Sequence, residues 1–207
     1  MKLQIAYEHT NLSDALAIAK ETATFADVLE VGILLIYKEG IKAVEAFKKE
    51  FPDKEILADA KICDRAKEAT ALFTKAGADI ITVLAGTSNQ IIHQATTIAG
   101  DAGVKIALDL ADAYSMGQSA MDAQQLGVDT ILFHRPHDGT PLTEILEQWD
   151  STRGNTKLPI FISGKITRSN IAQITGLKPQ GIVVGSAIVE ADNPAAEAQY
   201  FKSITNS

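Results

Sequence analysis

Short apolar segments of β-forming residues recur along the chain, and each is followed by a longer segment in which apolar residues repeat at helical spacing. The predicted strands cover residues 3–6, 28–31, 56–60, 80–84, 105–110, 130–133, 160–163 and 181–184. An apolar stripe of Ile91, Ala95, Ile98 and Ala99 predicts one of the helices, and Ser13-Asp14-Ala15-Leu16 has the composition of a capped helix start. Strands that alternate with helices in this way predict an α/β fold with a parallel sheet.

The alternation runs through residues 1–207 without a linker, which favours one domain. Several turns that lead back into strands share a glycine: Gly77-Ala78-Asp79, Gly127-Val128-Asp129 and Gln180-Gly181. Eight strand and helix units predict a single (β/α)8 TIM barrel, and a length of 207 residues lies near the lower limit for that fold. A doubly wound open sheet is the alternative, but no Gly-x-Gly-x-x-Gly sequence follows the first strand and no Gly-x-x-x-x-Gly-Lys-Ser/Thr loop is present.

Composition argues against several classes of protein. The net charge is −7 and no basic tract occurs, which argues against sequence-independent binding to nucleic acid. The first residues reach the carboxylate of Glu8 too early for a signal peptide, and no apolar run is long enough to span a membrane, so we expect a soluble, cytoplasmic protein. The single cysteine, Cys63, excludes an internal disulfide and is expected to be a small buried residue. The lack of Cys/His clusters excludes a structural zinc site.

Charged residues stand at the ends of several predicted strands. The third strand ends in Asp59-Ala60-Lys61, and because side chains alternate along a strand, the carboxylate and the ammonium should share one face. Charges in a buried strand need partners or a task, so this pair indicates either an active site or a structural ion pair. In a barrel the catalytic groups come from the carboxyl ends of several strands. Glu30 and Asp109 stand at the carboxyl ends of the second and fifth strands, and His134 follows the sixth strand.

Glu30 and Asp59 predict a site for a hard divalent cation, because the ends of adjacent strands bring the two carboxylates together. Magnesium is the natural candidate, since it can bind two oxygens of a substrate and hold the negative charge of an enediolate. Lys61 would add a second positive charge, and we expect the two carboxylates and the ammonium to keep one another ionised. For Glu30 taken alone, the alternative is a solvated strand end.

Further candidate groups follow the sixth, seventh and eighth strands. Ser163-Gly164 and Gly185-Ser186 each place small residues between a strand and a helix, where backbone N–H groups can approach a phosphate. His134 follows an apolar strand and is a candidate proton carrier. His9 and His93 are expected to make local hydrogen bonds instead.

Several segments carry a resemblance that covers nearly the whole chain: Leu3-Gln4-Ile5-Ala6, Glu30-Val31-Gly32, Ala58-Asp59-Ala60-Lys61-Ile62-Cys63-Asp64, Gly77-Ala78-Asp79, His134 and Val184-Gly185-Ser186-Ala187-Ile188. They resemble the phosphosugar lyases of the orotidine 5'-phosphate decarboxylase superfamily, namely hexulose-6-phosphate synthase and 3-keto-L-gulonate 6-phosphate decarboxylase. The most specific motif is Asp-x-Lys-x-x-Asp. The resemblance implies Glu30 and Asp59 as magnesium ligands, Lys61 as the group that stabilises the enediolate, and Asp64 as a residue that reaches into the site of a neighbouring subunit. It also implies a homodimer with shared active sites.

The resemblance implies two possible reactions. Both pass through a 1,2-enediolate, formed by loss of carbon dioxide in the decarboxylase and by release or addition of formaldehyde in the synthase. Asp109 is similar to the synthases, whereas Arg135 directly after His134 is similar to the decarboxylase, whose second arginine aligns with His137. We favour the synthase, with the decarboxylase as the alternative. The implied catalytic residues are Lys61, Asp59, Asp64, His134, Asp109, Glu8 and Arg135, and the implied phosphate-binding residues are Ser163, Gly164, Lys165, Gly185 and Ser186.

Three residues depart from the family pattern. Glu8 stands where the family has aspartate, Lys165 replaces the second glycine of a phosphate loop, and Ser186 replaces an arginine found in many members. Lys165 is expected to attract a phosphate dianion and to replace the missing positive charge. Together the three departures also motivate a barrel that binds phosphosugars without turnover. A barrel similar to the phosphopentose epimerases is a further alternative, but it does not explain Asp59 and Lys61 on one strand.

Overall fold

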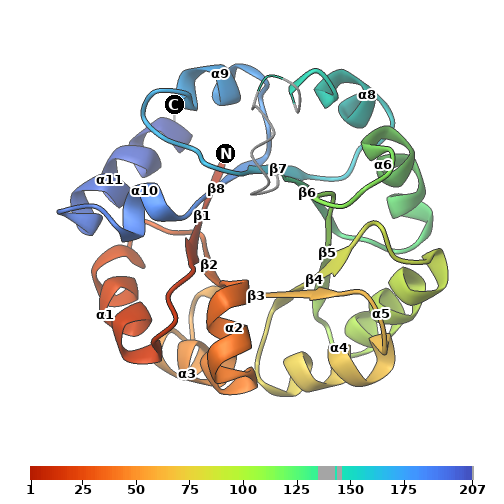
Figure 1. The fold of residues 1–207 in the computed structure, drawn as a ribbon, viewed down its shortest axis with the longest axis horizontal. Helices are drawn as coiled ribbons and strands as arrows, with labels where there is room; N and C mark the ends of the chain where they lie inside the picture. The colour runs from red at the N-terminus through yellow and green to blue at the C-terminus, as the bar shows by residue number, and fades with distance from the viewer. Residues whose placement is uncertain (135–142, 144–145, 207) are drawn as a thin grey trace.

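The sheet closes on itself in a computed structural model, which describes residues 1–134, 143 and 146–206. Eight parallel strands follow one another around a barrel, and β1 pairs with both β2 and β8 (Figure 1). The strands are β1 Lys2–Tyr7, β2 Val28–Val31, β3 Glu55–Ile62, β4 Ile80–Leu84, β5 Lys105–Asp109, β6 Thr130–His134, β7 Ile160–Ser163 and β8 Gly181–Val184. The predicted (β/α)8 TIM barrel is confirmed, and the open, doubly wound alternative is wrong.

Helices form an outer ring around the strands (Figure 1). They are α1 Leu12–Thr22, α2 Ile33–Glu39, α3 Ile41–Glu50, α4 Ala66–Lys75, α5 Asn89–Asp101, α6 Met116–Gln125, α8 Trp149–Gly154, α9 Ile171–Gly176, α10 Ser186–Val189 and α11 Pro194–Thr205. The first helix begins earlier than predicted, because Asn11 and not Ser13 is its N-cap: the Asn11 side chain accepts hydrogen bonds from the backbone N–H groups of Ser13 and Asp14. Within the described residues, no helix has both the length and the apolar character needed to cross a bilayer.

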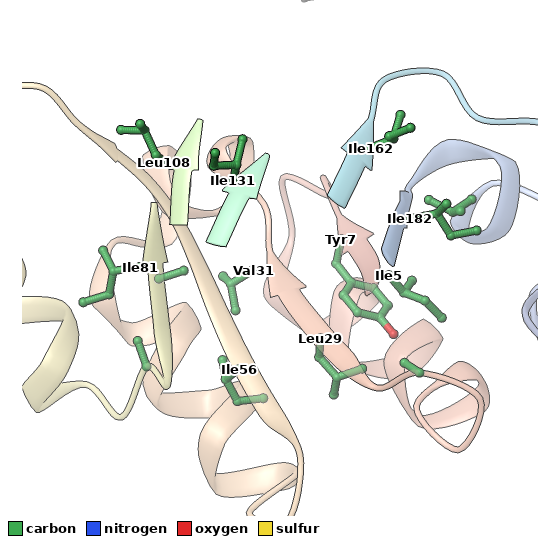
Figure 2. Close-up of a cluster of buried hydrophobic side chains, with 14 of the residues drawn as sticks. Ile5, Tyr7, Leu29, Val31, Ile56, Ile81, Leu108, Ile131, Ile162 and Ile182 are labelled. Atoms are coloured by element: carbon green, nitrogen blue, oxygen red, sulfur yellow. The ribbon is translucent and has the colours of Figure 1, made fainter. Parts of the chain in front are cut away.

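One face of each strand packs against the helices. Buried side chains such as Ile5, Leu29 and Ile56 belong to a large apolar cluster between the strands and the helix layer (Figure 2). Tyr7 shows the direction of this face, because its hydroxyl lies 2.8 Å from the hydroxyl of Thr22 in α1 and the centre of its ring lies 5.3 Å from that of Phe47 in α3. Because side chains alternate along each strand, the remaining residues point into the barrel.

A separate apolar cluster fills the interior of the barrel. It takes one residue from each strand, and we call it the barrel floor: Ala6, Val28, Leu57, Ile80, Ala107, Leu132, Phe161 and Val183. The packing here is tight, since a Cβ atom on Gly181 would lie 2.5 Å from the ring of Phe161. The barrel is therefore closed by side chains at this level, and a ligand can enter only above or below it.

Candidate active site

The inward residues that follow the barrel floor form a polar ring at the carboxyl ends of the strands. Each stands two positions after its floor residue, so the alternation of side chains turns it inward again. We call this set the mouth ring: Glu8, Glu30, Asp59, Thr82, Asp109, His134, Ser163 and Gly185. Most of the residues that the sequence analysis singled out therefore share one layer of the barrel.

Lys61 joins this layer through an irregularity in β3. The pairing of β3 with β4 runs from Ala58 opposite Ile81 to Ile62 opposite Val83, so β3 carries extra residues between these pairs. Lys61 has a φ of 43°, in the left-handed region that side chains rarely adopt. Its ammonium lies 3.1 Å from the carboxylate of Asp59. The two side chains share a face as expected, but a bulge and not regular alternation brings them together.

A network of three groups connects Lys61 to His134. The Lys61 Nζ atom donates to Asp109 Oδ2 at 2.6 Å, and the His134 Nδ1 atom lies 3.0 Å from both oxygens of that carboxylate. Asp109 is fully buried. Burial by itself raises the pKa of Asp109, but the hydrogen bond and charge of His134 and the charge of Lys61 outweigh it and hold this pKa below its usual range. Asp109 therefore stays ionised beneath the two cationic or proton-carrying groups.

The positive charge of Lys61 is secured by the same contacts. Burial works to lower the pKa of its ammonium, but the carboxylates of Asp109 and Asp59 raise it above the ordinary value of a lysine. Lys61 is thus a fixed cation at the edge of the barrel mouth, which is what a group that stabilises developing negative charge requires.

Three carboxyl groups of the mouth ring lie close together, and one of them, Asp59, contacts Lys61. Glu8, Glu30 and Asp59 each offer an oxygen, and these atoms all lie within 4.8 Å of one another. Burial raises the pKa of Glu30 well above its usual range, the charges of Asp59 and Glu8 raise it further, and the hydrogen bond from Gln4 at 2.5 Å opposes this only in part. Burial likewise raises the pKa of Asp59, against the charge of Lys61.

The expectation that Glu30, Asp59 and Lys61 keep one another ionised agrees with the raised pKa of Lys61, whereas burial shifts the pKa of both carboxyl groups upward, against the ionised form. Lys61 gives its shortest contact to Asp109, so the cluster of acids has too little positive charge of its own. The interpretation of Glu30 as a solvated strand end is wrong, because only 6% of this residue is exposed. Buried oxygens with unbalanced negative charge are the donor set that a hard divalent cation fits.

Glu8 reaches this cluster although it is longer than the aspartate of the family pattern. Its Oε2 atom accepts a hydrogen bond from the backbone N–H of Leu34 at 3.0 Å. The side chain passes close to Gly32, where an added Cβ atom would lie 2.5 Å from the Glu8 carboxyl. Burial raises the pKa of Glu8, and the hydrogen bond from Leu34 opposes this. The glycine thus leaves room for the extra methylene of Glu8.

A cavity of about 790 Å³ opens above the mouth ring. Its walls include the acidic cluster, Lys61 and His134, and also the residues predicted to bind phosphate: Ser163, Gly164, Lys165, Gly185 and Ser186. Lys165 and Ser186 are exposed. The backbone turns at this loop, where φ is 115° for Gly164 and 49° for Lys165. The cavity has the size of a pocket for a small metabolite and brings the two predicted parts of the site together.

The structure does not bring every predicted residue into this cavity. Asp64 is exposed, accepts a hydrogen bond from the backbone N–H of Arg65, and lies outside the cavity wall. Its neighbour Cys63 is exposed too, so the expectation of a small buried residue is wrong; these residues leave the barrel after the bulge. Arg135 and His137 lie outside the described residues.

Sequence reasoning missed several residues around the site. Thr82 and Gln4 are buried polar residues that hold Asp59 and Glu30, and counting two positions from Ile80 along β4 would have found Thr82. His9 lines the cavity, and its buried Nδ1 atom has no hydrogen-bond partner among the described residues, so the expected local hydrogen bond is wrong for this atom. The position at a strand end could have distinguished His9, which follows β1, from His93, which lies in α5 and is exposed.

Comparison with known proteins agrees with this geometry. The chain is similar to the 3-hexulose-6-phosphate synthase of Bacillus subtilis (strain 168), with 32% identity over 99% of this chain and 98% of the relative. The 3-hexulose-6-phosphate synthase 3 of Staphylococcus saprophyticus is 29% identical over 98% of this chain and 97% of its own length. The enzyme class that these relatives share is that of a lyase, as the residue pattern indicated.

Solved structures show the same fold along the whole chain. The 3-hexulose-6-phosphate synthase from Salmonella typhimurium superposes with a TM-score of 0.92 and 29% identity, covering 100% of this chain and 99% of the other. KGPDC from Streptococcus mutans has a TM-score of 0.91 at 23% identity, covers 99% and 97% of the two chains, and shows the fold alone. The family model of the orotidine 5'-phosphate decarboxylase / HUMPS family matches residues 1–201, and this chain belongs to that family.

Proposed function

We propose that this protein is a magnesium-dependent carbon–carbon lyase that acts on a ketose 6-phosphate through a 1,2-enediolate. The reaction most like its own is that of hexulose-6-phosphate synthase, in which ribulose 5-phosphate and formaldehyde are joined. The observation that carries the proposal is one cavity that holds the acidic cluster, the fixed cation Lys61 and both predicted phosphate loops. The name of the B. subtilis relative, matched along the whole chain, supports the same reaction.

The residues present fit magnesium. Glu30 and Asp59 are carboxyl groups whose pKa values are raised first by burial and then by nearby negative charge, and a divalent cation would oppose this effect. In our proposal Glu30 and Asp59 would hold the ion, which would supply positive charge that stabilises an anionic intermediate of the sugar. Gln4 supports this role, because its side-chain N–H donates to Glu30 Oε2 and fixes the orientation of that carboxyl group.

His134 is proposed as the group that moves the proton. Asp109 stays ionised 3.0 Å from His134 Nδ1, so in our proposal Nδ1 donates to this carboxylate and Nε2 is the atom that exchanges a proton with the substrate. His134 lines the cavity, whereas Asp109 is buried behind it and therefore acts as a positioning residue. In the synthase direction Nε2 removes a proton from C1 of ribulose 5-phosphate to give the enediolate. C1 then forms a bond to the carbon of formaldehyde as the C=O π bond breaks, and the resulting alkoxide takes up the proton held by Nε2.

Lys61 is proposed to stabilise the enediolate, because its ammonium stays charged at the edge of the site. At the phosphate end, Lys165 supplies the charge that Ser186 lacks, and the small residues Ser163, Gly164 and Gly185 let backbone N–H groups approach the dianion. Glu8 would contact the sugar or the ion from the end of β1.

We also propose a homodimer in which Asp64 serves the site of the neighbouring subunit. Asp64 is exposed and lies outside the cavity wall of its own chain, which is the placement such a role needs. Arg135 remains a proposed catalytic residue by resemblance, and its position next to His134 in the sequence favours the alternative, 3-keto-L-gulonate 6-phosphate decarboxylase.

One assay tests these proposals. The protein is incubated with ribulose 5-phosphate, formaldehyde and Mg²⁺, and separately with 3-keto-L-gulonate 6-phosphate, each with and without EDTA. We expect hexulose 6-phosphate to form, activity to disappear with EDTA and to return with excess Mg²⁺. Turnover of the gulonate substrate alone would establish the decarboxylase instead. A rate that EDTA does not change would contradict the proposed dependence on magnesium. Binding of ribulose 5-phosphate without any turnover would indicate a phosphosugar-binding barrel.

A further inference from the structure

Thr82 belongs to the mouth ring, but neither the sequence analysis nor the proposed reaction assigns it a role. It stands in the middle of β4, between Ile81 and Val83, and is fully buried. Its strand is otherwise aliphatic, and a valine would fill the same volume. A hydroxyl in the interior of a barrel lowers stability unless hydrogen bonds satisfy it, so its partners show what it does.

The Thr82 hydroxyl uses both of its hydrogen-bonding capacities on β3. The Oγ1 atom accepts from the backbone N–H of Lys61 at 2.8 Å and donates to Asp59 Oδ1 at 2.9 Å. One side chain therefore holds the main chain of the fixed cation and the carboxyl group of a proposed metal ligand. These two residues are the ones that the sequence motif places at the centre of the chemistry.

The bulge in β3 explains why a side chain is needed there. Regular pairing stops after Ala58 and resumes at Ile62, so Thr82 lies opposite the stretch that has left the ladder. The left-handed φ of Lys61 persists only where the surroundings hold it, and Thr82 supplies the acceptor for its N–H group. Without the hydroxyl, that N–H would have to find another acceptor, and the Lys61 ammonium would lose its defined position beside Asp109.

We propose that Thr82 is a positioning residue of the active site, which sets the orientation of the Asp59 carboxyl group and the backbone conformation that carries Lys61. The inference rests on the proposed function, because it takes Asp59 as a metal ligand and Lys61 as the group that stabilises the enediolate. Partners that orient metal ligands typically change metal affinity or activity by about 10- to 100-fold when they are removed.

The test separates the hydroxyl from the volume of the side chain. Thr82→Val keeps the shape and removes the hydroxyl, whereas Thr82→Ser keeps the hydroxyl and removes a methyl group. Thr70→Val is the matched control, because Thr70 is also fully buried but its hydroxyl has no partner among the described residues. For each variant we would measure the Kd of Mn²⁺ and Mg²⁺ without substrate, kcat and KM with ribulose 5-phosphate and formaldehyde, and the Tm.

We expect Thr82→Val to weaken metal binding and to lower kcat, each by about 10-fold or more, with a smaller change in KM for the phosphosugar. Thr82→Ser should stay within about 3-fold of the wild type in Kd and kcat, because the hydroxyl that orients the metal ligand is retained. A role in packing alone predicts the opposite order, with serine the worse variant and Kd unchanged in both. Values for Thr82→Val that match those of Thr70→Val would overturn the proposal.

A crystal structure of Thr82→Val tests the positioning role independently of the metal-binding measurements. We expect Lys61 to leave the left-handed conformation and its ammonium to move away from Asp109. Unchanged positions of Asp59 and Lys61 would refute the positioning role even if activity fell. If the wild-type protein binds neither ion, the magnesium part of the proposed function fails, and the structure together with the order of kcat in the valine and serine variants still decides the role of Thr82. Should Thr82→Val not fold, Thr82→Ala replaces it in the same comparisons.

Discussion

The two ends of the barrel use the same residue types in opposite ways. At the amino-terminal end, Glu55 lies between Lys2 at 2.6 Å and Lys105 at 2.7 Å. Burial works against ionisation of Glu55, but the hydrogen bonds and charges of the two lysines outweigh it and lower its pKa. At the carboxyl-terminal end, burial and neighbouring acids raise the pKa of Glu30 and no lysine contacts it directly among the described residues. The ion pairs of Glu55 stabilise the fold, whereas Glu30 is buried beside other acids without a compensating positive charge in contact with it among the described residues.

The difference between the two ends indicates that, in the part of the chain that the structure describes, buried acids without paired positive charge are confined to the end of the barrel that carries the candidate site. Acids that only support the fold are paired near solvent, as Asp27 is with Lys202 at 2.7 Å. Acids that are buried together without enough positive charge lower stability, and proteins keep such groups where function requires them. The imbalance at the mouth of the barrel is thus a physical argument for a cationic ligand that does not depend on sequence similarity.

The largest effect should come from removing a charge at the carboxyl-terminal end. We expect Asp59→Asn to lower kcat by about 100-fold or more and to weaken Mg²⁺ binding, because the change removes a proposed ligand and a partner of Lys61. Steady-state kinetics and calorimetric titration with Mg²⁺ check this. Glu55→Gln is the matched control at the other end and should leave both quantities unchanged. An Asp59→Asn variant with intact rate and metal affinity would show that our role for this carboxyl group is wrong.

A smaller effect is expected at the phosphate end of the cavity. Lys165→Ala should raise KM for the phosphorylated ketose by about 10-fold and lower kcat less, because in our proposal the lysine binds the phosphate, a part of the substrate that does not react. Lys178→Ala is the matched control, since Lys178 is also exposed, has a left-handed φ of 56° and lies outside the cavity wall. An unchanged KM in Lys165→Ala would contradict the proposed phosphate contact.

Stability should respond to pH in opposite directions at the two ends. Because the pKa of Glu30 is raised on folding, the folded protein holds its proton more tightly than the unfolded chain, and Glu30 lowers stability as the pH rises above its unfolded value. Glu30→Gln should therefore stabilise the metal-free protein by about 1 kcal/mol at neutral pH and lose this advantage in acid. Chemical denaturation across a pH series measures the difference. A destabilised variant at neutral pH would mean that Glu30 is already balanced by positive charge.

The smallest effect belongs to Glu55. Its pKa is lowered on folding, so it adds stability above its unfolded pKa, and this contribution is lost as the pH falls through the folded value. Glu55→Gln should reduce stability at neutral pH by about 0.5 kcal/mol, since the ion pairs are close to solvent. The same pH series, run in low and high salt, should show the difference shrink in salt. A gain in stability at neutral pH would remove the contrast between the two ends.

Counting along the sequence predicts much of this site. The pattern of eight apolar strands indicated the barrel, and the polar residues at strand ends indicated Glu30, Asp59, Asp109 and His134. Both follow from local rules, because strand alternation fixes which residues point inward and the parallel arrangement brings the carboxyl ends together. The same alternation along β4 predicts that Thr82 points into the barrel as well.

Other features depended on contacts between distant parts of the chain. The bulge in β3 needs the register against β4, and the left-handed Lys61 needs the acceptor on Thr82. The exposure of Cys63 follows from that bulge, and the raised pKa values follow from how many acids the closed barrel buries together. The strands and the residues that point into the barrel were predictable from the sequence, because both depend on the pattern of neighbours along the chain. Charge balance and side-chain position required the folded structure, because both depend on burial and on partners tens of residues away.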